Sequence, residues 1–221
     1  MKTDNGNRAY RYFEAIEKHA GALGVAIAIM VSLGGLAEIT PLFMEAQKVQ
    51  PADGIKPYDP LRLVGRDVYV REGCYLCHSQ MIRALRFETE RYGAYSVASE
   101  SVYDRPFQWG SKRTGPDLAR VGAKYSDAWQ RQHLIDPRSL VPASNMPAFP
   151  WLSADKIDAA DVRARMRTLR RIGDPYSDAD IEAAPKTLDG KTELDALVAY
   201  LQGLGVLNEP ASASAPKASA P

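Results

Sequence analysis

The chain has 221 residues, and its 28 basic and 27 acidic side chains give a net charge of +1. This balance excludes the broadly basic surface that attracts nucleic acid, so we expect no nucleic-acid partner. Only two cysteines are present, fewer than a small secreted scaffold held together by disulfides would carry. Because they lie three positions apart, we expect a local chemical role for them.

The first predicted element is a membrane-spanning helix. Residues 20–37 form an unbroken run of 18 uncharged residues, and a helix of that length extends about 27 Å, close to the hydrocarbon thickness of a bilayer. The apolar character continues to residue 44. We therefore assign residues 1–19 to a cytoplasmic segment and residues 20–44 to a transmembrane anchor. A cleaved secretory signal with Gly35-Leu36-Ala37 as its cleavage site is the alternative, although the run is longer than a typical signal core.

Basic residues are more frequent before the span than in a similar length after it. This asymmetry favours a cytoplasmic N-terminus and export of everything that follows the anchor. Within the span, small side chains recur every fourth residue, at Ala20, Gly24, Ala28 and Ser32. Small residues at this spacing let two helix backbones approach closely in lipid, which indicates a helical partner in the membrane.

Composition divides the exported part into three segments. Residues 45–60 are rich in proline and polar groups and predict a linker, and the Ala/Ser/Pro run at 208–221 predicts a disordered tail. Residues 61–207 form one domain without an internal repeat, and strand signals in it are scarce. We expect a mainly α fold, with helices over Leu61–Gly73, Ser126–Ile135, Ser153–Arg171 and Thr192–Gly203.

The two cysteines belong to the sequence Cys74-Tyr75-Leu76-Cys77-His78. In a C-x-x-C-H sequence each thiol can form a thioether with a haem vinyl group, and the adjacent imidazole can bind the iron. A redox dithiol and half of a zinc site are the alternatives, but the first needs a βαβ context and the second needs further ligands. We therefore expect one covalent c-type haem on Cys74 and Cys77, with His78 as an axial ligand.

The second axial ligand must come from another part of the chain. A methionine thioether is soft and neutral, and it raises the reduction potential of a haem. Among Met81, Met146 and Met166 we favour Met146, because its proline-rich loop can present one sulfur atom rigidly. Met81 follows the motif too closely to reach the other haem face, and Met166 lies in a charged helical stretch. His133, in a predicted helix, is the rival ligand.

Several features resemble a class I cytochrome c. Gly115-Pro116-x-Leu118 follows the cysteine motif, Met146-Pro147 comes later, and an aliphatic helix ends the domain. In that family the Gly-Pro-x-Leu proline packs on the proximal histidine, and its carbonyl oxygen accepts the imidazole N–H. The resemblance implies that Pro116 orients His78. It also implies a crossing of the first and last helices of the domain through Gly65, Tyr69, Leu197 and Tyr200.

Longer strings resemble the monohaem subunit II of cbb3-type cytochrome c oxidases. They extend over roughly residues 20–205 and are rarely shared by other cytochromes. The strings are Gly35-Leu36-x-Glu38-Ile39-x-Pro41-Leu42-Phe43, Gly65-Arg66-Asp67-x-Tyr69, Cys77-His78-Ser79-Gln80-Met81-Ile82-Arg83, Glu90-Arg91-Tyr92-Gly93 and Trp109-Gly110-Ser111-Lys112-Arg113-Thr114-Gly115-Pro116-Asp117-Leu118.

This resemblance implies a single-pass subunit of the bacterial inner membrane, with its haem domain in the periplasm. The subunit would not be catalytic itself. It would relay electrons from a dihaem cytochrome c subunit to catalytic subunit I of a proton-pumping haem-copper oxidase, which reduces oxygen to water. The implied partners are therefore these two subunits and membrane lipid.

The segment 79–114 is longer than a compact cytochrome needs to wrap a haem. It is rich in arginine and aromatic residues, which interface cores favour. We interpret it as an insertion that docks on the catalytic subunit, and a solvated loop without a partner is the alternative. Two other functions remain open at this point: a free membrane-tethered electron carrier, and a haem peroxidase or ligand sensor with a vacant sixth position.

Overall fold

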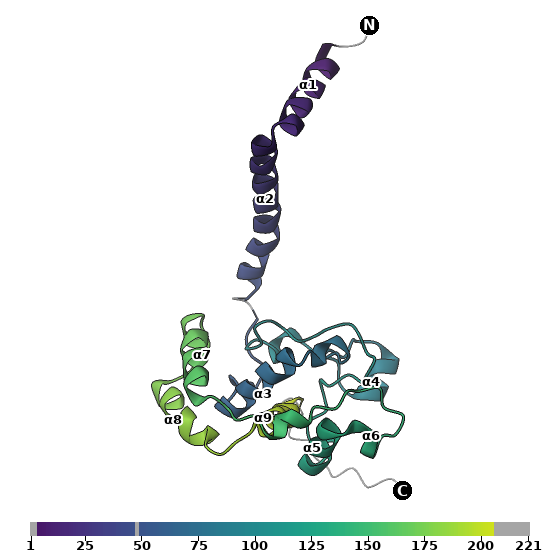
Figure 1. Ribbon diagram of the computed structural model, residues 1–221, viewed down its shortest axis with the longest axis vertical. Helices are drawn as coiled ribbons and strands as arrows, with labels where there is room; N and C mark the ends of the chain where they lie inside the picture. Colours follow the sequence, from purple (N-terminus) through teal and green to yellow (C-terminus); the bar gives the residue numbers. More distant parts are fainter. Residues whose placement is uncertain (1–3, 47–48, 206–221) are drawn as a thin grey trace. The chain divides into compact units, whose positions relative to one another are not determined.

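The computed structural model describes residues 4–46 and 49–205. Its contacts divide the chain into two units, and the boundary along the sequence falls between Gln50 and Pro51. The first unit consists of helices α1 (Asp4–Lys18) and α2 (Ala20–Ala46). The second unit is a helical domain (Figure 1). The tail predicted at 208–221 lies outside the described residues.

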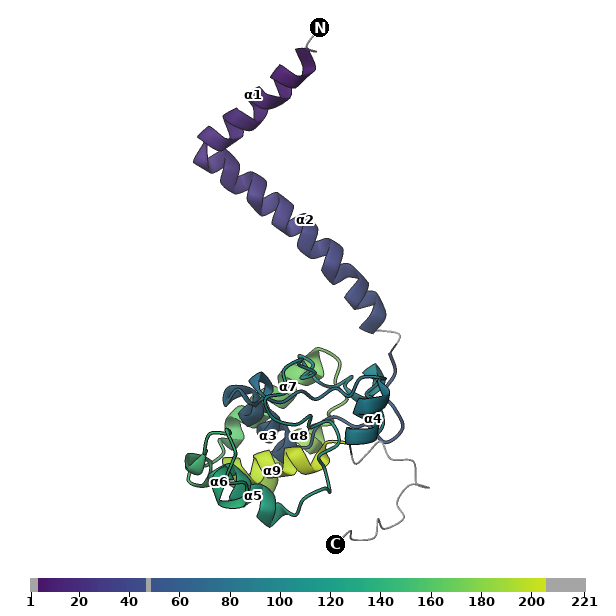
Figure 2. The same ribbon diagram turned by 90° about the vertical axis from the view of Figure 1, so that its right-hand side faces the viewer.

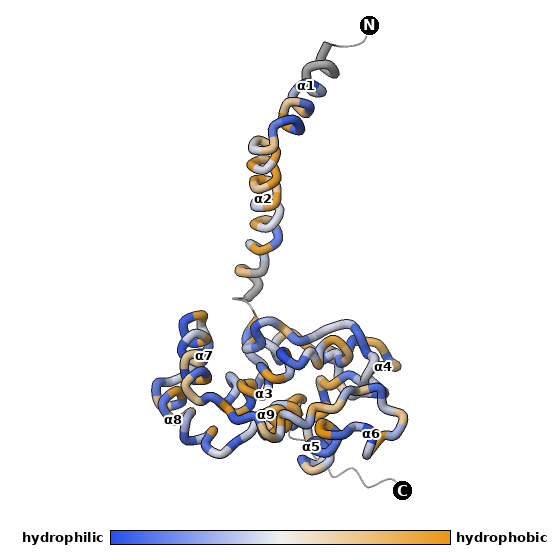
Figure 3. Tube along the Cα trace, in the orientation of Figure 1, coloured by the Kyte–Doolittle hydropathy of each residue, from blue (hydrophilic) through white to orange (hydrophobic). Residues whose placement is uncertain are grey.

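Helix α2 contains the predicted membrane-spanning segment. Residues Ala20–Pro41 form 22 helical residues that are long and apolar enough to cross a bilayer, and none of their most apolar stretch is buried within the protein. Their length is about 33 Å at the usual helical rise, and apolar residues dominate α2 along this stretch (Figure 3). The expectation of one N-terminal membrane helix followed by a mainly α domain is confirmed.

Ten helical segments make up the second unit, and within its described residues the only β-pairing is an isolated bridge between Lys156 and Thr192. The segments are α3 (Pro60–Arg71), η1 (Cys74–Leu76), α4 (Arg86–Tyr92), η2 (Ala98–Glu100), α5 (Asp127–Ile135), α6 (Pro137–Leu140), η3 (Pro150–Ser153), α7 (Ala159–Arg171), α8 (Asp178–Leu188) and α9 (Glu193–Gly203).

The core of the domain is the crossing of α3 and α9, which lie side by side (Figure 2). A Cβ atom on Gly65 would come within 2.0 Å of the Ala196 carbonyl oxygen, so only glycine permits this approach. The rings of Tyr69 and Tyr200 pack beside it with centroids 5.5 Å apart, and Leu197 is buried between the helices and the rest of the core. The predicted helix crossing is confirmed.

The ends of these two helices follow from local sequence. Asp59 caps α3 by accepting the backbone N–H of Arg62, and Pro60 occupies the first turn, where its missing N–H costs nothing. Thr192 caps α9 in a reciprocal capping box with Asp195.

The helix predicted over Ser153–Arg171 begins only at Ala159, so the prediction was wrong for residues 153–158. The Ser153 hydroxyl donates to the Pro150 carbonyl oxygen and closes the short helix η3, so it does not cap α7. The Asp158 carboxylate caps α7 instead, by accepting the backbone N–H groups of Ala160 and Asp161. Helices α4, α6 and α8 were not predicted, and α8 contains Pro185.

The end of the segment predicted as a linker packs on the domain. The backbone N–H of Ala52 donates to the carbonyl oxygen of Ser99. The Tyr58 ring packs edge-on against Tyr200, with centroids 5.7 Å apart, and its hydroxyl donates to Asp104. The domain therefore includes residues well before α3.

The insertion is held to the domain by buried charges more than by apolar packing. Asp104, 9 % exposed, pairs with Arg66 of α3, 6 % exposed, at 2.7 Å, and Arg66 also donates to the Pro106 carbonyl oxygen. This pair fixes the C-terminal half of the insertion to α3.

A second cluster, here called the insertion network, consists of Ser79, Glu88, Arg113 and Asp117. The Arg113 guanidinium donates to Glu88 at 2.7 Å and to the Ser79 hydroxyl at 2.7 Å. The Ser79 hydroxyl in turn donates to Asp117 at 2.5 Å. Glu88 is fully buried, and the Arg113 hydrogen bond holds its pKa down at about 2. The network ties α4 to the chain just after the cysteine motif.

Candidate functional site

The cysteine motif lies in a tight turn that follows α3. Gly73 ends the helix with φ 71°, a left-handed conformation that favours glycine. The chain then forms η1, and the backbone N–H groups of Cys77 and His78 both donate to the Cys74 carbonyl oxygen. The turn therefore brings two thiols and one imidazole into a single loop. Both cysteines are free thiols, Cys77 exposed and Cys74 half-buried.

The Gly115–Leu118 segment supports His78 from a distant part of the sequence. Two backbone hydrogen bonds join it to the motif loop, from Gly115 to Cys77 and from Leu118 to Ser79. Nδ1 of His78 lies 2.8 Å from the Pro116 carbonyl oxygen, so this nitrogen carries the proton and donates it. A Cβ on Gly115 would come within 2.3 Å of the His78 ring, which explains the glycine before the proline.

A mostly apolar slot opens in front of His78. Side chains from α3, the motif, the Pro116 segment, α5, the Met146 loop and α9 line it. They are Tyr69, Cys74, His78, Pro116, Leu118, Val121, Tyr125, Trp129, Gln130, His133, Leu134, Met146, Leu197 and Leu201.

Met146 reaches the slot from a loop without regular structure. The loop is fixed at both ends, because Arg138 donates to the Ser144 carbonyl oxygen at 3.1 Å and the backbone N–H of Phe149 donates to Leu134. The Met146 backbone N–H itself donates to the Ser144 hydroxyl. The Met146 side chain, with its thioether sulfur, therefore lines the slot.

Helix α5 contributes an aromatic ladder and two hydrogen-bonding groups without partners. Tyr125 stacks on Trp129 and Trp129 on His133, with centroids 4.0 and 4.6 Å apart. Burial, with His78 nearby, lowers the pKa of His133, which favours the neutral imidazole. Nδ1 of His133 and Nε2 of Gln130 are both buried without a hydrogen-bond partner, and Gln130 is only 4 % exposed.

These features fit a haem better than the other groups proposed for the motif. Burial raises the pKa of the Cys74 thiol to about 12, whereas a redox dithiol relies on a thiol with a lowered pKa. Among the described residues no three His, Cys, Asp or Glu side chains are grouped as a metal site would need. An apolar slot with two unpaired nitrogens, an imidazole and a thioether suits a flat apolar ring that carries acceptors at its edge.

Four sequence-predicted residues line the slot, namely Cys74, His78, Pro116 and Met146, and Cys77 lies exposed in the adjoining motif turn. Met81 and Met166 do not line the slot; the Met81 backbone N–H donates to Asp117, and Met166 is fully buried in the core. Sequence reasoning missed Gln130 and the ladder. Gln130 and Trp129 lie three and four residues before His133 on the helix predicted over Ser126–Ile135, and this spacing was the signal that could have placed them beside it. Tyr125 precedes that helix.

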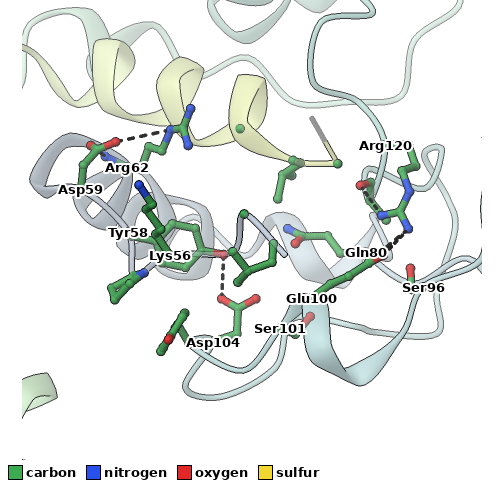
Figure 4. A pocket seen from close by; sticks show the side chains of 18 residues that line it. Lys56, Tyr58, Asp59, Arg62, Gln80, Ser96, Glu100, Ser101, Asp104 and Arg120 are labelled. Atoms are coloured by element: carbon green, nitrogen blue, oxygen red, sulfur yellow. Dashed lines mark hydrogen bonds and ion pairs between the residues drawn. The ribbon is translucent and has the colours of Figure 1, made fainter. Parts of the chain in front are cut away.

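A larger cavity of about 510 Å³ lies elsewhere in the domain. Polar and apolar groups both line it, and the charged side chains in its walls are largely paired: Tyr58 points to Asp104, and Arg120 to Glu100 (Figure 4). It contains none of the residues of the motif.

The sequence of the chain matches one protein family over residues 13–192, described as the mono-haem subunit of cytochrome c oxidase, FixO. No curated protein sequence matches the chain. The match covers most of the chain, including the membrane helix, the motif and the Met146 loop. The chain belongs to the FixO family, the mono-haem cytochrome c subunits of cbb3-type cytochrome c oxidases.

Proposed function

We propose that the slot holds one c-type haem, bonded covalently through Cys74 and Cys77 and ligated by His78 and Met146. The observation that carries this proposal is the placement of His78 and Met146 in one slot next to the cysteine turn. When bound, the haem supplies a single electron site that alternates between ferric and ferrous iron.

Each residue of the slot has a separate task in this proposal. The hydrogen bond to Pro116 keeps the proton on Nδ1 of His78, which leaves Nε2 free to bind iron and fixes the ring plane. The Met146 sulfur would close the sixth position, so the chain would pass electrons and bind no substrate. Gln130 and His133 would donate hydrogen bonds to the carboxylate edge of the haem, because a buried donor without a partner is costly.

The chain would act as the middle step of an electron relay, from a dihaem cytochrome subunit to catalytic subunit I of a proton-pumping oxidase. Membership in the family supports this role, as does the placement of His78 and Met146 in the lining of one slot. We further propose that α2 crosses the bacterial inner membrane once, with the N-terminus in the cytoplasm and the domain in the periplasm.

We propose that the insertion provides the contact with the catalytic subunit. Glu88 and Arg113 of the insertion are turned into the insertion network, whereas Arg86 and Glu90 form an exposed ion pair. The insertion also leaves large apolar side chains exposed. The most exposed are Leu85, Phe87, Tyr95, Val97 and Phe107. Tyr92 and Trp109 are less suited to docking, because Arg113 lies over the Tyr92 ring and Trp109 donates to Ser101.

Gentle detergent extraction of the host membranes tests this role against a free tethered carrier. The chain is expected to elute with a large protein that contains b-type haem, and the double change Phe87→Ala and Tyr95→Ala is expected to weaken that association. The matched control is Ile172→Ala, which removes an exposed apolar side chain outside both the insertion and the slot. A parent chain that elutes alone would contradict the subunit role.

A further inference from the structure

Helix α1 has an apolar face that α2 brings to the membrane. Tyr12 and Phe13 lie one helical turn before Ile16 on one side of α1, and the three residues are 69, 68 and 38 % exposed. The opposite side carries Arg11, Glu14 and Lys18, and Lys18 pairs with Glu14 one turn away at 2.5 Å. A helix of 15 residues with an uncovered aromatic face is only marginally stable in water.

Only His19 separates α1 from α2. The helical hydrogen-bond pattern is interrupted there, since the His19 N–H donates to Ile16 in a tighter turn. The helix axis changes direction at this point (Figure 2). Helices α1 and α2 are therefore two separate helices with a bend between them at His19.

The bend keeps Ile16 within reach of the membrane interface at any angle between the two helices, and Tyr12 reaches the interface when α1 tilts toward the membrane surface. Ile16 precedes the first residue of the span by four positions, about 6 Å of helix, and Tyr12 by eight, about 12 Å. The headgroup layer of one leaflet is about 5–8 Å thick. Amphipathic helices with aromatic residues on the apolar side bind at this depth, and tyrosine is favoured there.

We propose that α1 lies along the membrane surface at the N-terminal end of the span, with Tyr12, Phe13 and Ile16 inserted into the boundary between headgroups and acyl chains. The occupant of the apolar face is lipid. In-plane binding would fix the rotation and depth of α2, which a single span alone leaves free. The proposal requires α2 to cross the membrane and does not depend on the haem.

Spin labels on single introduced cysteines test this arrangement in the full chain, reconstituted in phosphatidylcholine nanodiscs. Positions 11 to 18 are labelled one at a time, and collisions with oxygen and with a water-soluble nickel chelate are measured. The unsubstituted chain, treated identically, reports any label on Cys74 or Cys77. The ratio of oxygen to nickel accessibility is expected to oscillate with a period of about 3.6 residues, with maxima at Tyr12, Phe13 and Ile16 and minima at Arg11, Glu14 and Lys18.

Three outcomes would overturn the proposal. Nickel access at all positions would place α1 in water, and uniform oxygen access would place it inside the bilayer as part of the span. Exclusion of both reagents from positions 12, 13 and 16 would show that protein covers the face. As a matched pair, Phe13→Asp is expected to raise nickel access at a label on position 16, and Glu14→Ser is expected to leave it unchanged.

Discussion

The insertion network and the slot both contain buried polar groups, but their hydrogen bonds are complete only in the first. Glu88, Arg113 and Asp117 bond to one another and to nearby backbone groups. In the slot, Nε2 of Gln130 and Nδ1 of His133 have no partner. A complete network stabilises a loop and has no capacity left for a ligand, whereas unpaired donors in an apolar slot require one. The network therefore stabilises the fold, and the slot keeps two donors available for a ligand.

The largest expected effect comes from Met146→Ala, which should change the spectrum and not the fold. With the thioether removed, the sixth position opens. The low-spin spectrum is expected to be lost, carbon monoxide is expected to bind the reduced chain, and the potential should fall. Met166→Leu is the control, because this methionine is buried outside the slot. An unaltered low-spin spectrum in Met146→Ala would assign the ligand to another residue, His133 first.

Asp104→Ala should produce the opposite pattern, a loss of stability without a change of spectrum. It leaves the buried Arg66 without its ion-pair partner, which is expected to cost about 3 kcal/mol of unfolding free energy. Glu90→Ala breaks the exposed pair with Arg86 and should cost about 0.5 kcal/mol or less. Chemical denaturation measures both. Equal costs for the two variants would mean that the buried pair does not anchor the insertion.

Acid should loosen the insertion before it affects the slot. The Arg113 hydrogen bond holds the pKa of Glu88 at about 2, below the ordinary value of 4.5. Stability from this group is complete above the unfolded pKa and is lost as the pH falls from about 4.5 to about 2. The Arg83 amide, which donates to Glu88 at 2.9 Å, should then exchange faster, after correction for intrinsic rates. In Glu88→Gln that pH dependence should disappear; its persistence would refute the assignment.

Gln130→Leu should have the smallest effect. If the amide donates to a haem carboxylate, its loss raises the pKa of that carboxylate, because the ionised form loses a hydrogen bond. The pH dependence of the midpoint potential should then move to higher pH. Gln132→Leu is the control, since Gln132 on the same helix is exposed and donates to Ser139. Identical potential profiles for the two variants would contradict a role for Gln130 at the carboxylate edge.

Local rules were sufficient to predict part of the fold and the residues of the site. The helix over Ser126–Ile135 begins at a serine cap that the sequence displays. The Gly-Pro-x-Leu resemblance anticipated the contact of Pro116 with His78, which the structure has at 2.8 Å. These features depend on residues close in sequence, or on a motif.

Features that depend on distant partners could not be predicted. Ser153 failed as a cap because its hydroxyl bonds backward to Pro150, and nothing in the sequence favours that bond over a cap. The pairing of Arg66 with Asp104 joins residues 38 positions apart. Gln130 was not a predicted site residue, because the burial of its nitrogen without a partner depends on packing around the slot. Helix α1 was not predicted, because residues 1–19 had been interpreted from their charge alone and not from the spacing of their apolar residues.

The most direct test of the account is a haem-stained denaturing gel of the full chain, matured in a host that attaches c-type haem. The stain is expected to remain with the polypeptide in the parent chain, and to be lost when Cys74 and Cys77 are both replaced by alanine. Met166→Leu should retain the stain at the parent level. A parent polypeptide that migrates without haem would contradict the account.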